Sequence, residues 1–295
     1  MKKVKFKTIL NIIIETYKNW SANDPFQLSA AVSYYALFSF PALLIIVIQT
    51  AGVFYEESEI KGKIINEIGA VLGKDSAQTI ETMITNAIDQ DQTGIAIIIG
   101  IATLLYGATG MFIALQRSLN IIWGVKPNPK NEYLKMIRDR VFSLGLILII
   151  GFLLLTSLVL TALITAVINW AEQFMPDFMI QIIQILNFVV SLALITVLFA
   201  LIFKILPDVK MRWRDVWLGS FVTALLFSLG KSGLGIYFGT ANPGSTFGAA
   251  GSIILILLWV SYSSLILFFG AELTQVLAAK YGSGIKPSPY AEEIS

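Results

Sequence analysis

The chain has 295 residues, of which 56% are hydrophobic and 14% are charged, and its formal net charge is +2. Soluble domains carry about 25% charged residues, so this composition predicts an all-α, polytopic membrane protein. The sequence contains no Cys and no His, which excludes disulfides, thiolate or imidazole metal ligands and catalytic triads built on His. The small net charge gives no indication of a nucleic-acid partner.

The first 23 residues are predicted to form a basic, amphipathic segment at the membrane surface. Apolar side chains recur there at spacings of three and four, and lysines surround them: Phe6, Ile9, Ile13, Tyr17 and Trp20, with Lys2, Lys3, Lys5, Lys7 and Lys18. This pattern is typical of a helix that lies in the plane of the interface. A frayed basic tail is the alternative interpretation.

Six segments are long and apolar enough to cross a hydrocarbon core of ~30 Å at a rise of ~1.5 Å per residue. They cover residues 26–54, 94–116, 141–168, 179–205, 216–238 and 249–272. Residues 24–276 are therefore expected to form one domain of six transmembrane helices. The remainder, 277–295, contains Gly and Pro and is expected to be a flexible cytoplasmic tail.

The first span has a recognisable beginning and an interior proline. Asp24 fits the N-cap and Pro25 the first helical position. Pro41, near the middle of the span, is expected to bend the helix.

The connection over residues 55–93 is predicted to contain two short amphipathic helices, separated at residues 73–76. Because their apolar faces need cover, we expect them to lie over the outer mouth of the bundle, where they would gate access. The second span then carries a stripe of small residues that includes Gly100, Gly107 and Gly110. Such a stripe lets a neighbouring backbone approach closely, so its predicted role is helix packing.

Lys and Arg counts in the connections predict the orientation. The N-terminal segment has five, the 117–140 connection six and the 204–214 connection four, whereas residues 169–178 have none. Positive residues stay in the cytoplasm. Both termini are therefore predicted to be cytoplasmic.

Five short motifs occur in order along the chain. The first is Ala30, Ala31, Ser33, Tyr34, Tyr35, Ala36, Leu37, Phe38, Ser39, Phe40 and Pro41, and the second is Leu119, Asn120, Trp123 and Gly124. The third is Leu206, Pro207 and Asp208 before a basic Trp loop, and the fourth is Gly230 and Lys231 ahead of Tyr237. The fifth is Phe247, Gly248, Ala249, Ala250 and Gly251, continued by Leu258, Trp259, Val260, Gly270, Ala271 and Glu272. Over residues 20–275 this pattern resembles the YihY/BrkB family of bacterial inner-membrane proteins.

The resemblance implies a multi-pass location in the bacterial inner membrane and a link to virulence, envelope biogenesis and lipid or lipopolysaccharide export. We therefore expect a transporter or export protein for an anionic or amphipathic substrate, with membrane lipids as partners. A non-transporting scaffold in envelope biogenesis is the alternative, and oligomerisation stays open. In both cases Gly248 and Gly251 are expected to serve helix packing.

The family's older label, ribonuclease BN, is regarded as a misassignment, and the residues favour neither a nuclease nor another hydrolase. RNA hydrolysis needs a cluster of metal-binding carboxylates or His. The acidic residues of the 55–93 connection are scattered instead, as on a solvated surface. We expect no enzyme activity, no cofactor and no metal.

Three charged residues are predicted at the inner ends of spans: Asp24, Arg117 and Glu272. Ionised groups at this depth tend to pair or to face the bundle interior. We expect Arg117 to bridge to Glu272 or to Asp24. The alternative is that each side chain reaches headgroup water separately.

Lys231 is the one charge deep within a predicted span. Gln184, Asn187 and Gln49 are expected at a similar depth on two other spans, which suggests a polar cavity open to the outer side. A lysine there would suit an anionic headgroup. The alternatives are that Lys231 extends to the interface along its aliphatic stem or has another structural partner.

Overall fold

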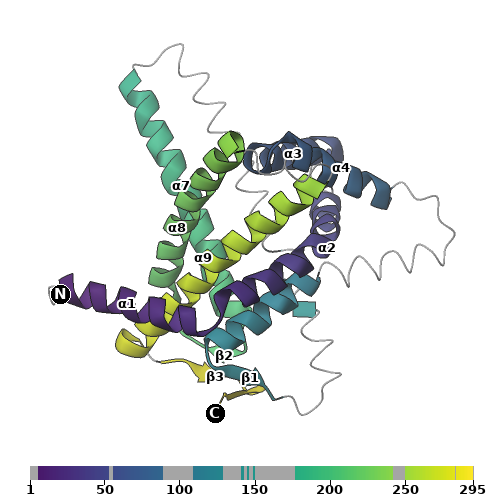
Figure 1. Cartoon of the computed structure of the whole chain (residues 1–295). Helices are drawn as coiled ribbons and strands as arrows, with labels where there is room; N and C mark the ends of the chain where they lie inside the picture. The colour runs from purple at the N-terminus through teal and green to yellow at the C-terminus, as the bar shows by residue number, and fades with distance from the viewer. Residues whose placement is uncertain are drawn as a thin grey trace.

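The computed structural model describes residues 6–52, 56–88, 109–128, 141–142, 145, 149, 177–241, 250–282 and 284–294. In this part of the chain, long helices cross one another and two pairs of very short strands lie at one end (Figure 1). The all-α prediction is therefore confirmed for the main body, with the strands as a small addition.

Four long apolar helices form the body: α2 (Pro25–Gly52), α7 (Asp177–Ile205), α8 (Trp213–Ala241) and α9 (Gly251–Tyr281). Three segments, within α7, α8 and α9, are long and apolar enough to cross a membrane. α2 begins at Pro25, as predicted, and α9 ends nine residues beyond the predicted boundary at residue 272. The predicted spans 94–116 and 141–168 lie largely outside the described residues, so the number six and the cytoplasmic termini remain predictions.

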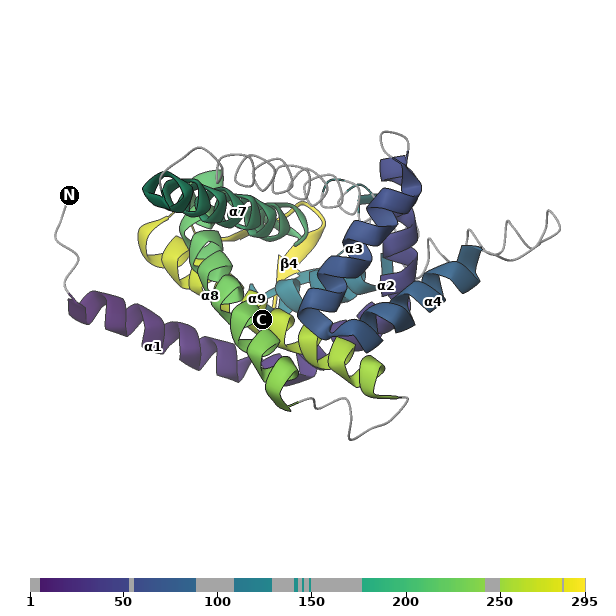
Figure 2. The same cartoon turned by 90° about the horizontal axis from the view of Figure 1, so that it is seen from above.

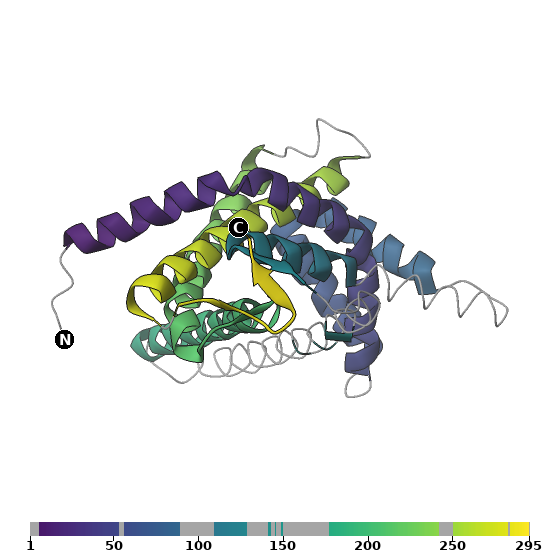
Figure 3. The same ribbon diagram turned by 90° about the horizontal axis from the view of Figure 1, so that it is seen from below.

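Helix α2 continues through Pro41 without interruption. Its direction changes along its length in two perpendicular views (Figures 1 and 3). A proline in the helix interior removes one backbone hydrogen bond and is an expected cause of such a bend.

Helices α8 and α9 pack against each other as an antiparallel pair with a matched motif. α8 contains Gly219 and Thr223, and α9 contains Gly270 and Thr274, so that each helix has Gly-x-x-x-Thr. A methyl group on Gly219 would lie 2.9 Å from Thr274 Cβ, and one on Gly270 would lie 2.8 Å from Thr223 Cβ. Each threonine hydroxyl also donates to the carbonyl of the glycine in its own helix, over 2.7 Å. The two helices therefore interlock through two glycine–threonine contacts.

Four further helices of the described chain lie around this pair. α1 (Phe6–Ala22) packs mainly on α9, and the helix over residues 109–122 lies against α2. The 55–93 connection contains two helices, α3 (Glu57–Leu72) and α4 (Lys74–Ile88), as predicted. They meet at Gly73, whose φ of 86° favours glycine.

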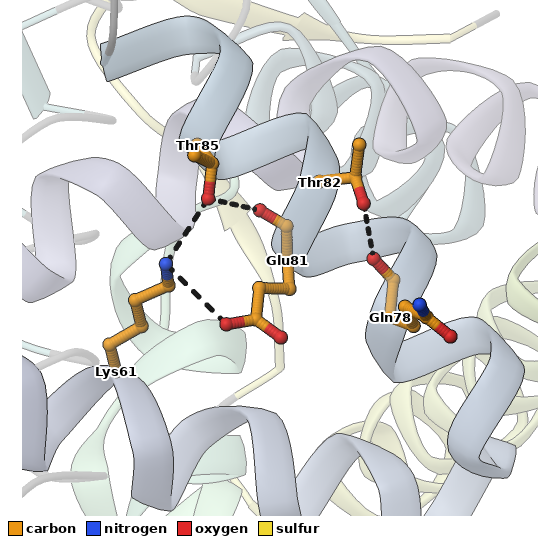
Figure 4. A network of polar contacts seen from close by, with 5 residues as sticks. All are labelled: Lys61, Gln78, Glu81, Thr82 and Thr85. Carbon is orange, nitrogen blue, oxygen red and sulfur yellow. Dashed lines mark hydrogen bonds and ion pairs between the residues drawn. The ribbon is translucent and has the colours of Figure 1, made fainter.

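Helices α3 and α4 pack on one another and lie near the start of α9, at the opposite end of the molecule from the strands (Figures 1 and 2). Lys61 on α3 joins them: its ammonium donates to Thr85 Oγ1 over 3.2 Å and lies 3.5 Å from Glu81 Oε1 (Figure 4). Helices α3 and α4 therefore lie at one end of the described helices, and their predicted position over the outer mouth stays a prediction.

The C-terminal tail was expected to be flexible, and this expectation is wrong for residues 284–294. Strand β3 (Lys286–Pro287) pairs with β2 (Val209–Lys210), and β4 (Ala291–Glu293) pairs with β1 (Val125–Pro127), both antiparallel (Figure 3). The Ser288 amide donates to Asp208 O, and the Ile294 amide donates to Gly124 O. Gly and Pro residues predict turns, but they carry no information on whether the tail can pair with a loop that is distant in sequence.

We predict that Gly219→Ala or Gly270→Ala destabilises the protein by about 1–3 kcal/mol, because the added methyl group must push α8 and α9 apart. Unfolding in mixed micelles measures the change. Gly233→Ala is the matched control on α8, where a methyl group would meet nothing within 4 Å. Equal effects at Gly233 and Gly219 would contradict the interlock.

A second prediction concerns the tail. Backbone amides of residues 288 and 294 are hydrogen-bonded, so they should exchange hydrogen for deuterium more slowly than in an unstructured peptide. Mass spectrometry of the tail peptide measures this. Exchange at the rate of a free peptide would show that the tail does not pair.

Candidate functional site

Among the charged side chains of the described chain, the one with an exposed fraction of 0% lies near the end where α9 finishes. Glu272 on α9 is fully buried. Asn23, in the turn between α1 and α2, donates its side-chain amide to Glu272 Oε1. The second carboxylate oxygen, Oε2, has no hydrogen-bond partner. A buried carboxylate with one amide donor and no counter-charge is unusual, because removing a charge from water is costly.

The predicted ion pair from Arg117 to Glu272 or to Asp24 is not formed. Arg117 lies on the exposed side of the helix over residues 109–122, and Asp24 is exposed in the turn, where its φ is 46°. Asn23 occupies the position beside Glu272 that the prediction gave to a charged partner. The sequence places Asn23 before a helix start, but it does not show that this turn folds back onto α9.

Two of the motifs meet directly beside this site. Asn120 donates its side-chain amide to Asp208 Oδ2 over 3.0 Å and accepts from the Asp208 backbone amide over 2.8 Å. Trp123 Nε1 donates to the Ala271 carbonyl over 3.1 Å. All four residues are buried. These contacts join the helix over residues 109–122 to the loop after α7 and to the end of α9.

Helix α2, which carries the first motif, packs along α9 and against the helix over residues 109–122. Ser29 Oγ lies 3.1 Å from Ser261 Oγ, and Ser39 Oγ accepts from the Met111 amide over 3.3 Å. A methyl group on Gly110 would lie 3.5 Å from Ser39 Oγ and from Tyr35 Cδ1, an ordinary contact distance, so the packing role of Gly110 stays a prediction. Gly251 is buried at the start of α9, whereas Gly100, Gly107 and Gly248 lie outside the described residues.

A cavity of about 760 Å³ lies at the same end, between α1, α8 and α9; we call it the α1–α8–α9 cavity. Most of its walls are aliphatic: Ile9, Ile12, Ile13, Leu218, Val222, Leu273 and Leu277. Polar groups come from the start of α8 and the end of α9: Arg212, Arg214, Asp215, Tyr281 and Gly282. Within the described part of the chain, neither arginine is in an ion pair.

The chemistry of this cavity suits an amphiphile. Its aliphatic walls accept a hydrocarbon chain, and guanidinium groups bind phosphate or carboxylate through paired N–H donors. α1 supplies one wall and also leaves several apolar side chains of its own exposed, among them Leu10, Ile14 and Tyr17. The N-terminal segment is thus helical over residues 6–22, as the first interpretation predicted, and its exposed apolar face suits the membrane interface.

Of the four residues predicted to line a polar cavity on the outer side, the structure describes the side chains of three, and these three stay separate. Lys231 on α8 and Gln184 on α7 are exposed, and Asn187 is half-buried with an unpaired Oδ1. No hydrogen bond joins these three side chains to one another. The side chain of Gln49, and most of the spans 94–116 and 141–168, lie outside the described residues, so the cavity remains a prediction.

We predict that Asn120→Ala destabilises the protein by about 1–3 kcal/mol, because it removes one hydrogen bond from the buried Asp208 carboxylate and one from the Asp208 backbone amide. Unfolding of the purified variant in mixed micelles measures the loss. Asn128→Ala is the control, since Asn128 makes an exposed hydrogen bond to Glu292. If Asn120→Ala, Asn128→Ala and the wild type have the same free energy of unfolding, the buried pair of Asn120 and Asp208 does not contribute to stability.

Comparisons with known proteins give one family match and a set of membrane-protein relatives. The family model described as "Virulence factor BrkB" matches residues 16–295. A UPF0761 membrane protein of Mannheimia succiniciproducens is 24% identical over 94% of this chain and 93% of its own length. One of Pseudoalteromonas atlantica is 26% identical, over 90% and 86% of the two chains.

A third relative, the UPF0761 membrane protein of Tolumonas auensis, is 30% identical over 61% of this chain. That match spans 57% of the Tolumonas protein, less than two thirds of its length. No solved structure matches the chain. The family match covers nearly the whole sequence and includes the motif residues that meet around Asp208 and Ala271, so the chain belongs to the BrkB virulence-factor family of integral membrane proteins.

Proposed function

We propose that this membrane protein binds an anionic amphiphile, with membrane lipids as the substrate class, and moves it or assists its export. The α1–α8–α9 cavity carries the proposal, because aliphatic walls and two arginines meet there. A lipid with a phosphate headgroup presents the complementary surface, a charged end joined to a hydrocarbon chain.

The position of the cavity supports an entry from the membrane interface. α1 leaves apolar side chains exposed beside it, and Trp213 and Trp217 are exposed at the start of α8. Tryptophan is enriched at membrane–water interfaces, where its ring is partly apolar and its N–H stays hydrated. The basic loop before α8 belongs to the predicted cytoplasmic side, so we propose that the amphiphile enters from the inner leaflet of the bacterial inner membrane.

The names of the relatives mention only a membrane protein, and the family description mentions only a virulence factor. Neither names a substrate. A role in the envelope agrees with both names, and the proposal assigns no catalytic residue. Lys231, Gln184 and Asn187 remain candidates for a later step on the outer side.

We predict that the double variant Arg212→Gln, Arg214→Gln binds anionic lipid at least about tenfold more weakly, because charge-assisted hydrogen bonds to phosphate each contribute about 1.5–3 kcal/mol. Native mass spectrometry or lipid titration in nanodiscs compares phosphatidylglycerol with phosphatidylcholine. Lys210→Gln is the control: Lys210 is exposed two residues before Arg212 and does not line the cavity. Unchanged binding in the double variant would contradict the proposal.

Transport needs a separate measurement. In proteoliposomes with a fluorescent anionic lipid, the wild type should increase the movement of lipid between leaflets, and the double variant should not. Lipid binding without movement would favour the non-transporting scaffold. If the protein neither binds lipid nor moves it between leaflets, lipid is excluded as the substrate.

A further inference from the structure

A second site lies beside the α1–α8–α9 cavity, around the buried carboxylate of Glu272. Glu272 does not line that cavity, although its neighbour Leu273 does. Its side chain has an exposed fraction of 0%, and within the described chain its one hydrogen bond comes from the neutral amide of Asn23. The amphiphile proposal makes no use of this carboxylate.

None of the described charged groups on the elements around Glu272 forms an ion pair with its carboxylate. On α1, Glu15 is paired with Lys280 of α9, and Lys18 is exposed. On α8, Arg214 is exposed and Asp215 lies near Gly282. Arg117 and Asp24 are exposed as well, and α2 contains no charged residue. None of the described basic side chains forms an ion pair with Glu272.

Two more buried polar atoms without partners occur on the face of α1 that contacts α9. They are Thr16 Oγ1 and Trp20 Nε1. Residues 16, 20 and 23 are spaced by four and three, so they share one face of the helical segment with Asn23. Trp20 packs its ring 6.2 Å from Phe269, and Ile12 packs with Leu273 and Val276. Thr16 lies between these two contacts along α1, so its side chain is on the face that contacts α9.

We infer that Glu272 binds a monovalent cation, either a proton or an alkali-metal ion such as Na⁺, at the interface of α1 and α9. A carboxylate in a membrane-embedded helix needs a positive charge, and none of the described side chains supplies one to Glu272. Glu272 Oε2 is the primary ligand. For Na⁺, the Thr16 hydroxyl offers a second oxygen, the ligand type that hard cations prefer. The Trp20 indole N–H can only donate, so it takes no part in ligation.

Cation binding at this site acts on the joint between α1 and α2. Asn23 holds the other oxygen of the same carboxylate, and α1 forms a wall of the amphiphile cavity. A change in the charge of Glu272 changes the strength of the Asn23 hydrogen bond, because hydrogen bonds to charged groups are about twice as strong as neutral ones. The site thereby connects cation binding to the position of α1.

The test uses the full-length protein in nanodiscs and two probes. The first is the thermal midpoint Tm in increasing NaCl, with choline chloride at equal ionic strength for comparison. The second is the infrared C=O band of a protonated carboxyl group. Glu272→Gln keeps the shape and removes the ligand charge, and Glu15→Gln is the matched control at the same interface, since Glu15 already has Lys280 as its partner.

For Na⁺, we expect Tm to rise by about 2–4 °C or more with NaCl and not with choline chloride, and Glu272→Gln should abolish the rise. For a proton, we expect no specific effect of Na⁺ and a protonated-carboxyl band that is absent from Glu272→Gln. Both results support the inference, and Glu15→Gln should behave as the wild type in each.

Absence of both signals would overturn the inference, because Glu272 would then be ionised without a cation. If Glu272→Gln does not fold, Asn23→Ala is used in its place. This variant keeps the carboxylate and loses the amide hydrogen bond, so either the infrared band or the NaCl concentration that gives half of the rise in Tm must shift. An unshifted band and an unshifted NaCl response in Asn23→Ala would also contradict the site.

Discussion

The close approach of α8 to α9 is the constraint on which the other contacts depend. Gly219 and Gly270 let each helix receive the threonine of the other, so the two backbones lie nearer than larger side chains would allow. α9 then contacts α1, α2, α3 and α4 as well, which makes it the central helix of the described structure. In lipid, where apolar surfaces gain little from meeting one another, such steric fit is a principal source of helix association.

A group of buried polar contacts lies at the end of the protein where α9 finishes. Asn120 and Asp208 are joined by two hydrogen bonds, Trp123 donates to the Ala271 carbonyl, and the tail adds a strand to each of two loops. Each contact joins segments that are distant in sequence, so hydrogen bonds add to helix packing in holding this end together. Glu272 differs from its neighbours because its polar environment is incomplete.

The arrangement separates two kinds of surface within a short distance. The α1–α8–α9 cavity is mainly aliphatic with arginines at the start of α8, whereas the Glu272 site is small, buried and acidic. α1 borders both, through Ile9, Ile12 and Ile13 on one side and through Thr16 and Trp20 on the other. A movement of α1 would therefore affect both sites together.

The sequence by itself determined the membrane class, the start of α2 at Pro25, the two helices between residues 57 and 88, and the family, because length, hydropathy and local motifs carry that information. It did not determine which side chains meet. Arg117 was expected beside Glu272, and the tail was expected to be flexible, but Asn23 lies beside Glu272 and the tail pairs with two loops. Only the tertiary structure decided these contacts, because they depend on how the helices rotate about their axes and where distant loops come together, and local periodicity does not encode either.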